Sequence, residues 1–238
     1  MTTQSHHDHV EKQFSSQASE YLTSTVHASG RDLQRLAVRL ADYPDASVLD
    51  MGCGAGHASF VAAQNVSAVV AYDLSAQMLD VVAQAAEARQ LKNITTRQGY
   101  AESLPFADNA FDIVISRYSA HHWHDVGAAL REVNRVLKPG GRLIVMDVMS
   151  PGHPVRDIWL QTVEALRDTS HVRNYTSGEC GFAPIFPDTC YHLTHYWLAA
   201  VDIPVASDNP VHYADAIRYN ARTPLQGSLL PLTRLVWA

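Results

Sequence analysis

The amino-acid sequence predicts an α/β protein in which a mostly parallel sheet is covered by helices on both faces. From residue 46 to about residue 148, short apolar strands alternate with helical segments. Strands joined in this way pair in parallel through right-handed crossovers. A glycine-rich turn follows the first strand, where open α/β sheets bind their ligands. The expected strands are Ser47–Asp50, Ala68–Asp73, Ile94–Gln98, Phe111–Ser116 and Arg142–Val148.

Helical segments of suitable length separate these strands. Gly56–Gln64 and Ala76–Arg89 are expected helices, and the second is long and rich in alanine. Val126–Leu137 places apolar residues at helical spacing along one face, and Lys138–Gly141 ends this helix with a proline and two glycines. One more amphipathic helix is expected over residues 155–169.

The first 45 residues also have a helical pattern. Phe14, Ala18 and Tyr21 are four and three residues apart, which places them on one face of a helix. A second helix is expected to begin at Asp32, a candidate N-cap, and to end before Pro44.

Composition excludes several classes of protein. The chain has 238 residues, of which 47% are apolar and 18% charged, so it can bury a core and is neither disordered nor fibrous. Its net charge of −6 argues against nucleic-acid or membrane-surface binding. Its three cysteines are too few for a disulfide framework, and no apolar run reaches the ~18 residues of a membrane helix. We expect a cytoplasmic protein without nucleic-acid or membrane partners, and leave its oligomeric state open.

The turn Asp50–Gly56 is the most informative motif. Glycines at alternate positions, Gly52, Gly54 and Gly56, let the backbone approach a ligand closely. The dinucleotide fingerprint is G-x-G-x-x-G, whereas the spacing here is G-x-G-x-G after an aspartate that would repel pyrophosphate, which disfavours an NAD-dependent oxidoreductase. S-adenosylmethionine, which carries a sulfonium and an ammonium, suits an acidic strand end better. The competing interpretation is a tight turn that binds nothing.

Asp73 ends the second expected strand, 19 residues after Gly54. A carboxylate about 20 residues past the glycine turn reaches the ribose hydroxyls in Rossmann-like sites. The alternative is an acid that only stabilises the N-terminus of the next helix.

Four motifs, in order, resemble class I S-adenosylmethionine-dependent methyltransferases of the ubiquinone/menaquinone-biosynthesis-like branch, methyltransferase type 11. Val48–Gly56 resembles the first motif of that family, and Gly99–Phe106 resembles its G-D-A-E-x-L-P-F loop. Phe111–Val114 and Leu137–Gly141 are similar to its fourth- and fifth-strand signatures. The resemblance covers roughly residues 10–175, and the chain as a whole is similar to an enterobacterial member. The fold it implies is Rossmann-like.

The resemblance implies a site for S-adenosylmethionine around the glycine turn. Gly52 and Gly54 would approach the methionine part of the cofactor, with Gly56 completing the motif. Asp50 would shape the floor of the site, and Asp73 would bind the ribose hydroxyls.

The resemblance also assigns the adenine end of the site. Leu74 would pack on the adenine, Ala101 and Glu102 would lie at its far edge, and Ser116 would lie near the amino-acid moiety. Tyr100 stands where the family has an aspartate that accepts a hydrogen bond from the adenine amine, so this contact departs from the family pattern.

Three regions are expected on the same basis. Residues 1–45 would form an N-terminal helical lid that carries Phe14 and Tyr21, and residues 46–178 would form the methyltransferase domain.

Residues 179–238 hold 6 of the 11 prolines and no lysine. We expect this tail to be irregular, to be less ordered than the domain, and to lack a proper sixth and seventh strand, leaving the sheet edge poorly covered. Two explanations of this tail are open, a divergent ending and a translated frameshift. The family resemblance ends abruptly, which favours the frameshift.

Candidate catalytic residues follow the fourth strand, in Ser119–Asp125. His121 or His122 could remove a proton from an attacking atom, and the alternative is a platform that only packs or contacts substrate. Trp123 could present its face to the sulfonium or to a planar substrate, or could pack at the start of a helix. The histidines of His6–His9 lack the helical spacing of a metal site, and no metal is expected.

The expected function is methyl transfer from S-adenosylmethionine to a small-molecule acceptor. The sequence does not name the acceptor, because acceptor pockets are built from variable loops. The alternative is a catalytically impaired cofactor-binding paralogue or scaffold, which Tyr100 and the irregular tail would favour.

Overall fold

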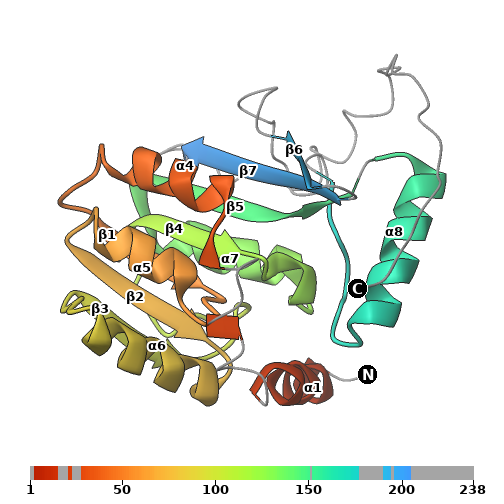
Figure 1. Ribbon diagram of the computed structural model, residues 1–238, viewed down its shortest axis with the longest axis horizontal. Helices are drawn as coiled ribbons and strands as arrows, with labels where there is room; N and C mark the ends of the chain where they lie inside the picture. The colour runs from red at the N-terminus through yellow and green to blue at the C-terminus, as the bar shows by residue number, and fades with distance from the viewer. Residues whose placement is uncertain are drawn as a thin grey trace.

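The computed structural model describes residues 3–15, 21–22, 28–150, 152–176, 190–193 and 196–204. Its strands form a single seven-stranded sheet in the order β3-β2-β1-β4-β5-β7-β6 (Figure 1). The strands β1 to β5 are parallel to one another, and β7 is antiparallel to β5. The bounds are Ser47–Met51 (β1), Ala68–Asp73 (β2), Ile94–Gln98 (β3), Phe111–Arg117 (β4), Leu137–Met149 (β5), Cys190–Leu193 (β6) and Tyr196–Pro204 (β7).

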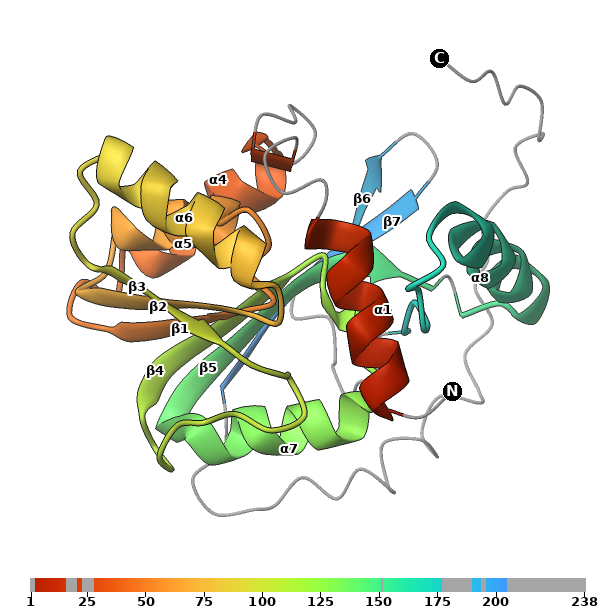
Figure 2. The same cartoon turned by 90° about the horizontal axis from the view of Figure 1, so that it is seen from below.

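Helices cover both faces of this sheet. Figure 2 shows α4, α5 and α6 on one face and α7 on the other, while α1 crosses the end of the sheet. This arrangement confirms the predicted Rossmann-like α/β fold. The helices are α1 (Thr3–Ser15), α4 (Arg31–Leu40), α5 (His57–Ala63), α6 (Ala76–Ala88), α7 (Val126–Val136), α8 (Pro154–Arg167) and the short 3₁₀ helix η1 (Ala120–His122).

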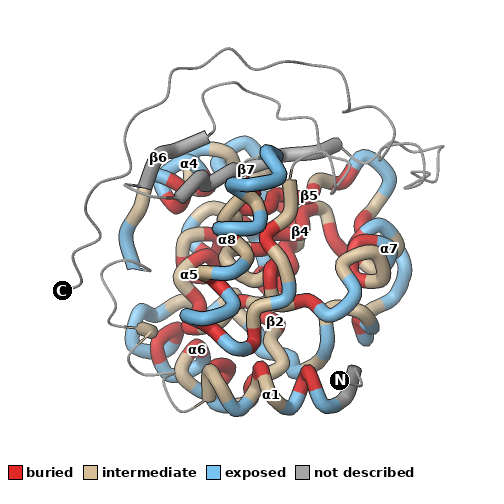
Figure 3. The backbone as a smooth tube through the Cα atoms, turned by 90° about the vertical axis from the view of Figure 1, so that its right-hand side faces the viewer, coloured by how far each residue is buried: buried red, intermediate tan, exposed pale blue. Residues whose placement is uncertain are grey.

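The central strands are apolar on both sides because both sides are buried. Val48 and Ile113 belong to a core beneath α4 and α5, whereas the next residues along each strand, Leu49 and Val114, face the core beneath α7. Alternate residues of a strand point to opposite faces, so a sheet with two covered faces needs continuous apolar runs. Figure 3 shows this buried interior running along β4 and β5.

The helix α4 belongs to the sheet domain. Leu33, Leu36 and Leu40 are buried in the same core as Val48. Asp32 is not the N-cap: Gly30 occupies that position, and Asp32 instead pairs with the buried Arg117 guanidinium of β4, at 2.5 Å. The region predicted as a lid therefore divides into two parts: α4 packs on the sheet, and α1 crosses the end of the sheet.

The expectation that the chain lacks a sixth and a seventh strand is wrong. β7 pairs with β5 from Arg142↔Pro204 to Met149↔Trp197, and β6 pairs with β7, so the edge of β5 is covered. The one proline of Tyr196–Pro204 is its last residue, where a missing N–H leaves the ladder intact. Residues 177–189 and 205–238, on which the rest of the tail prediction falls, lie outside the described residues.

Within the described ranges, no helix combines the length and the apolar character needed to cross a membrane.

Candidate active site

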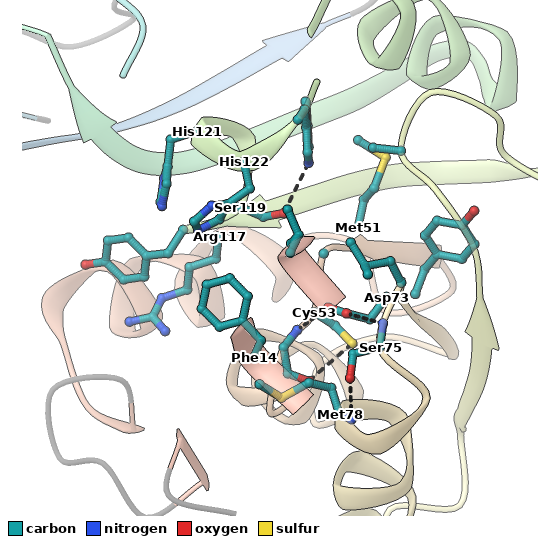
Figure 4. A pocket seen from close by; sticks show the side chains of 18 of the residues that line it. Phe14, Met51, Cys53, Asp73, Ser75, Met78, Arg117, Ser119, His121 and His122 are labelled. Atoms are coloured by element: carbon teal, nitrogen blue, oxygen red, sulfur yellow. Dashed lines mark hydrogen bonds between the residues drawn. The ribbon is translucent and has the colours of Figure 1, made fainter. Parts of the chain in front are cut away.

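A cavity of about 390 Å³ lies at the carboxyl ends of the parallel strands. Ligand sites in proteins have volumes of about 300–1,000 Å³, so this cavity can hold a small molecule. Figure 4 shows Asp73 and Ser75 at one end and His121 and His122 at the other, with Phe14 between them. Of the predicted residues, those that line it are Gly52, Gly54, Asp73, Leu74, Ala101, Glu102, Phe14, Tyr21, Trp123, His121 and His122.

The glycine turn forms the floor of this cavity. Gly52 and Gly54 have φ values of 72° and 51°, in the left-handed region that favours glycine. A Cβ atom at Gly52 would lie 1.8 Å from the Ser119 hydroxyl oxygen, so a neighbouring side chain occupies the space above it. A Cβ at Gly54 would meet nothing within 4 Å. The backbone at Gly54 therefore faces open space into which a ligand fits.

Asp73 is tied to this turn. Its carboxylate accepts hydrogen bonds from the Gly54 amide, at 2.8 Å, and from the Ser75 amide, at 2.9 Å. Burial raises the pKa of Asp73, and these two amides oppose that shift. Each carboxylate oxygen has a second lone pair. The side chain can therefore hold the turn and still accept a hydrogen bond from a ligand.

Three predicted cofactor residues do not line the cavity. Asp50 is fully buried and accepts a 2.5 Å hydrogen bond from the Ser59 hydroxyl, and Gly56 is packed against Val82 at the start of α5. Ser116 is buried within β4. The side chains that follow it line the cavity instead: Arg117, Tyr118 and Ser119.

Burial raises the pKa of Asp50 to about 6, and its Oδ1 atom has no hydrogen-bond partner among the described residues. Since the folded chain binds this proton more tightly than the unfolded chain does, we expect stability to fall as the pH rises from about 4 to about 6. A shift of this size corresponds to roughly 3 kcal/mol. Asp50→Asn should remove this part of the pH dependence and raise the free energy of unfolding at pH 7. Urea unfolding of both proteins between pH 4 and pH 8 tests this, and identical slopes would contradict it.

The rim opposite the glycine turn follows β3. Glu102 accepts hydrogen bonds from the amides of His124, at 2.9 Å, and Asp125, at 3.2 Å, so it fixes the segment before α7. Tyr100, which departs from the family pattern, stacks on His7 of α1 with ring centroids 4.3 Å apart. The ring of Tyr100 thus contacts the helix that covers the cavity.

Helix α1 covers the cavity through contacts that the sequence did not reveal. The His6 Nε2–H donates to the His122 carbonyl at 2.8 Å, and His9 lies 2.8 Å from the Thr169 hydroxyl. Phe14 packs edge-on against the His122 ring, at 5.0 Å. The histidine run that superficially resembles a metal site therefore consists of docking contacts. Among the described residues, no group of three or more His, Cys, Asp or Glu side chains is placed to hold a metal ion.

The two candidate catalytic histidines have different environments. His121 Nδ1 lies 2.5 Å from Asp147 Oδ1. Burial alone would lower the pKa of His121, but the carboxylates of Asp147, Glu164 and Asp168 together outweigh burial and raise it. His122 contacts Ser170, and burial and the neighbouring His121 lower its pKa to about 3. At neutral pH, His122 is therefore an uncharged wall of the cavity.

Trp123 takes part in a short chain of contacts behind the glycine turn. Its indole Nε1–H donates to the Ser119 hydroxyl at 3.1 Å, and that hydroxyl occupies the space above Gly52. The indole is almost fully buried. Its ring fixes the position of Ser119 beside the turn.

Comparison with known proteins identifies the family. Residues 49–145 match the family described as Methyltransferase domain. YcgJ of Bacillus subtilis, named as a methyltransferase, is 39% identical over 169 residues, covering 71% of this chain and 67% of that protein. The chain belongs to this methyltransferase family.

Other relatives are also similar to this chain, and those named as methyltransferases agree with the assignment. YafE of Escherichia coli is 92% identical over 128 residues, which cover 54% of this chain and 62% of that protein. The demethylmenaquinone methyltransferase of Lactococcus lactis is 31% identical, covering 68% of this chain and 66% of that enzyme. The crystal structure of YcgJ matches with a TM-score of 0.60 at 39% identity, covering 63% of this chain and 64% of that one. The chain thus spans about two thirds of the length of these relatives.

The sequence analysis missed several charged residues at or near the cavity. Arg117 lines the cavity at the carboxyl end of β4, and Asp147 lies near the carboxyl end of β5, which is the edge of the sheet where open α/β proteins bind their ligands. Glu164, Arg167 and Asp168 close the histidine end of the cavity from α8 and the residue after it. Only the tertiary packing of α8 shows that these three charges reach the site.

Proposed function

We propose that this methyltransferase transfers a methyl group from S-adenosylmethionine to a small-molecule acceptor. The observation that carries the proposal is one continuous cavity that begins at Gly54 and Asp73 and ends at the histidine pair. When bound, the cofactor supplies an electrophilic methyl group on a sulfonium, and the protein supplies position and exclusion of water.

The residues at the glycine end fit such a cofactor. The open space above Gly54 accommodates a ligand against the backbone, and the Asp73 carboxylate retains lone pairs for a ribose diol. Leu74 and Ala101 offer apolar surface to a base, whereas one face of the Tyr100 ring is stacked on His7. Cys53 is buried and its pKa is raised well above the ordinary value, first by burial, so it is not a nucleophile here.

The acceptor would bind at the opposite end, beneath α1. Phe14 and Tyr21 lie with ring centroids 5.8 Å apart and line the cavity between its two ends, where Phe14 also contacts His122. This placement supports the idea that α1 acts as a lid, which would admit the acceptor and then exclude water from the transferring methyl group. The volume of about 390 Å³ favours a small molecule over a macromolecule.

Thermal-shift measurements with S-adenosylmethionine, S-adenosylhomocysteine and NAD test the cofactor half of the proposal. We expect the first two to raise the melting temperature, since a ligand at 100 times its Kd stabilises by about 2.7 kcal/mol, and NAD to have no effect. Formation of S-adenosylhomocysteine with a panel of small acceptors tests the other half. Cofactor binding without turnover of any acceptor would favour the alternative of a catalytically impaired paralogue.

A further inference from the structure

His121 and Asp147 form a buried pair at the acceptor end of the cavity. The Asp147 Oδ1 atom contacts His121 Nδ1 at 2.5 Å and the Val148 amide at 2.7 Å, so the carboxylate is fixed in position. The two side chains are 8% and 12% exposed. The pair joins η1 to the end of β5, which are 26 residues apart in sequence.

This geometry determines which nitrogen of His121 is available. A neutral imidazole that donates Nδ1–H to a carboxylate keeps its lone pair on Nε2. The Nε2 atom makes no hydrogen bond to the described part of the chain, and His121 lines the cavity. An atom bound in the cavity can therefore give a proton to Nε2.

We propose that His121 accepts a proton from the methyl acceptor, that Asp147 positions it and stabilises the resulting imidazolium, and that the acceptor is a weak O–H or C–H acid. This inference rests on the proposed methyltransferase function. His121 is then a catalytic residue, and Asp147 is a positioning residue.

The proposed step balances. The acceptor oxygen or carbon gives its proton to His121 Nε2 and forms a bond to the methyl carbon, while the bond from that carbon to sulfur breaks and its electron pair stays on sulfur. One positive charge disappears from the sulfonium and one appears on the imidazolium, 2.5 Å from the Asp147 carboxylate. The proton leaves to solvent after the product departs.

Other charged groups near the His121–Asp147 pair also affect the protonation of His121. Glu164 and Asp168 favour the imidazolium, and Arg167 partly balances them because it pairs with Glu164. The rings of His122 and His171 lie 4.1 Å and 5.7 Å from the His121 ring. Burial and the charge of His121 lower the pKa of both neighbours, so the positive charge is confined to His121.

The first test is acceptor-independent: ¹⁵N NMR titration of the imidazole nitrogens in the full chain, with His121→Gln used to assign the signals. We expect protonation of His121 at Nε2, and we expect Asp147→Asn to lower the pKa of His121, because the neighbouring carboxylate favours the charged ring. Asp112→Asn, which alters a carboxylate bound to Lys138 and Ser47 outside the cavity, should leave it unchanged. An unaltered titration in Asp147→Asn overturns the pair.

The second test uses turnover. With phenol, catechol and acetylacetone as acids, and dimethyl sulfide and pyridine as acceptors without a proton to lose, we expect turnover of acids only. The rate with an acid should rise with pH through the pKa of His121 and fall at least tenfold in Asp147→Asn, with little change in KM. Turnover of dimethyl sulfide or pyridine would overturn the acceptor class. If no acceptor reacts, the NMR titration still decides whether the pair exists.

Calorimetry with S-adenosylmethionine separates this inference from the proposed function. His121→Gln and Asp147→Asn should bind the cofactor within about threefold of the parent protein, because both residues lie at the acceptor end. Loss of binding in the parent protein would refute the proposed function, whereas normal binding with an unaltered titration refutes only the proton-accepting pair.

Discussion

Gly54→Val is expected to weaken S-adenosylmethionine binding at least 100-fold while the chain still folds. A valine Cβ would clash with no protein atom, since nothing lies within 4 Å, but it would fill the space in which the ligand meets the backbone. With a φ of 51°, a residue other than glycine costs about 1–2 kcal/mol, so a moderate loss of stability accompanies the loss of binding. Isothermal titration calorimetry and urea unfolding measure the two effects separately.

Gly140→Val is a matched control for this variant. Gly140 has a φ of 77° and open space around its Cβ position, but it lies at the turn that leads into the main run of β5 and does not line the cavity. Its substitution should cost similar stability and leave binding unchanged. If both variants bind alike, backbone strain rather than the cavity would explain any effect, and the cofactor site would be misplaced.

Asp73→Ala is expected to reduce cofactor binding by 100-fold or more. The substitution removes the acceptor for the amides of Gly54 and Ser75, and a hydrogen bond to a charged group contributes about 1.5–3 kcal/mol. It also removes the carboxylate proposed to bind the ribose, so binding should suffer more than folding. Calorimetry measures the cofactor affinity of the variant, and its free energy of unfolding measures the effect on stability.

Asp125→Ala separates this effect from the general loss of a helix cap. The Asp125 carboxylate caps α7 by accepting a hydrogen bond from the Ala128 amide at 2.8 Å, but it does not line the cavity. Losing an N-cap costs about 1 kcal/mol. We expect Asp125→Ala to lower stability by that amount and to bind the cofactor normally. Equal binding losses in both aspartate variants would refute a ligand-binding role for Asp73.

The parts of the fold that local patterns determine were predictable. Ala68–Asp73 has the predicted bounds because an apolar run between turn residues specifies a strand that packs into the core. Ile94–Gln98 also has the predicted bounds, although it is a largely exposed strand at the edge of the sheet. The glycine turn lies where predicted because glycine adopts the positive φ of Gly52 and Gly54 without the strain that a Cβ atom brings. Local sequence therefore located the end of the sheet at which the cavity lies.

The parts that depend on tertiary contacts were not predictable. No local signal connects His121 with Asp147, and none indicates that Asp32 pairs with Arg117 across 85 residues instead of capping its helix. The docking role of His6 and its neighbours follows from the position of α1, which the sequence pattern does not specify. These contacts depend on how the helices and strands pack together, which local sequence does not specify.

The end of the chain is the remaining sequence question. The number of prolines in residues 179–238 led to the wrong prediction for this segment. The strand Tyr196–Pro204 contains one proline, at its last position, where it does not interrupt the strand. The frameshift hypothesis remains a prediction. Translating the gene in its other two frames tests it: a family-like ending in one frame would support it, and none in either frame would refute it.

The most direct test of the central claim is calorimetric titration of the full chain with S-adenosylmethionine, followed by the same titration with NAD. We expect saturable binding of S-adenosylmethionine with a Kd well below 1 mM, which corresponds to a binding free energy more favourable than about −4 kcal/mol, and no binding of NAD. Absence of binding at millimolar S-adenosylmethionine, or tighter binding of NAD, would contradict the assignment of this cavity as the cofactor site of a methyltransferase.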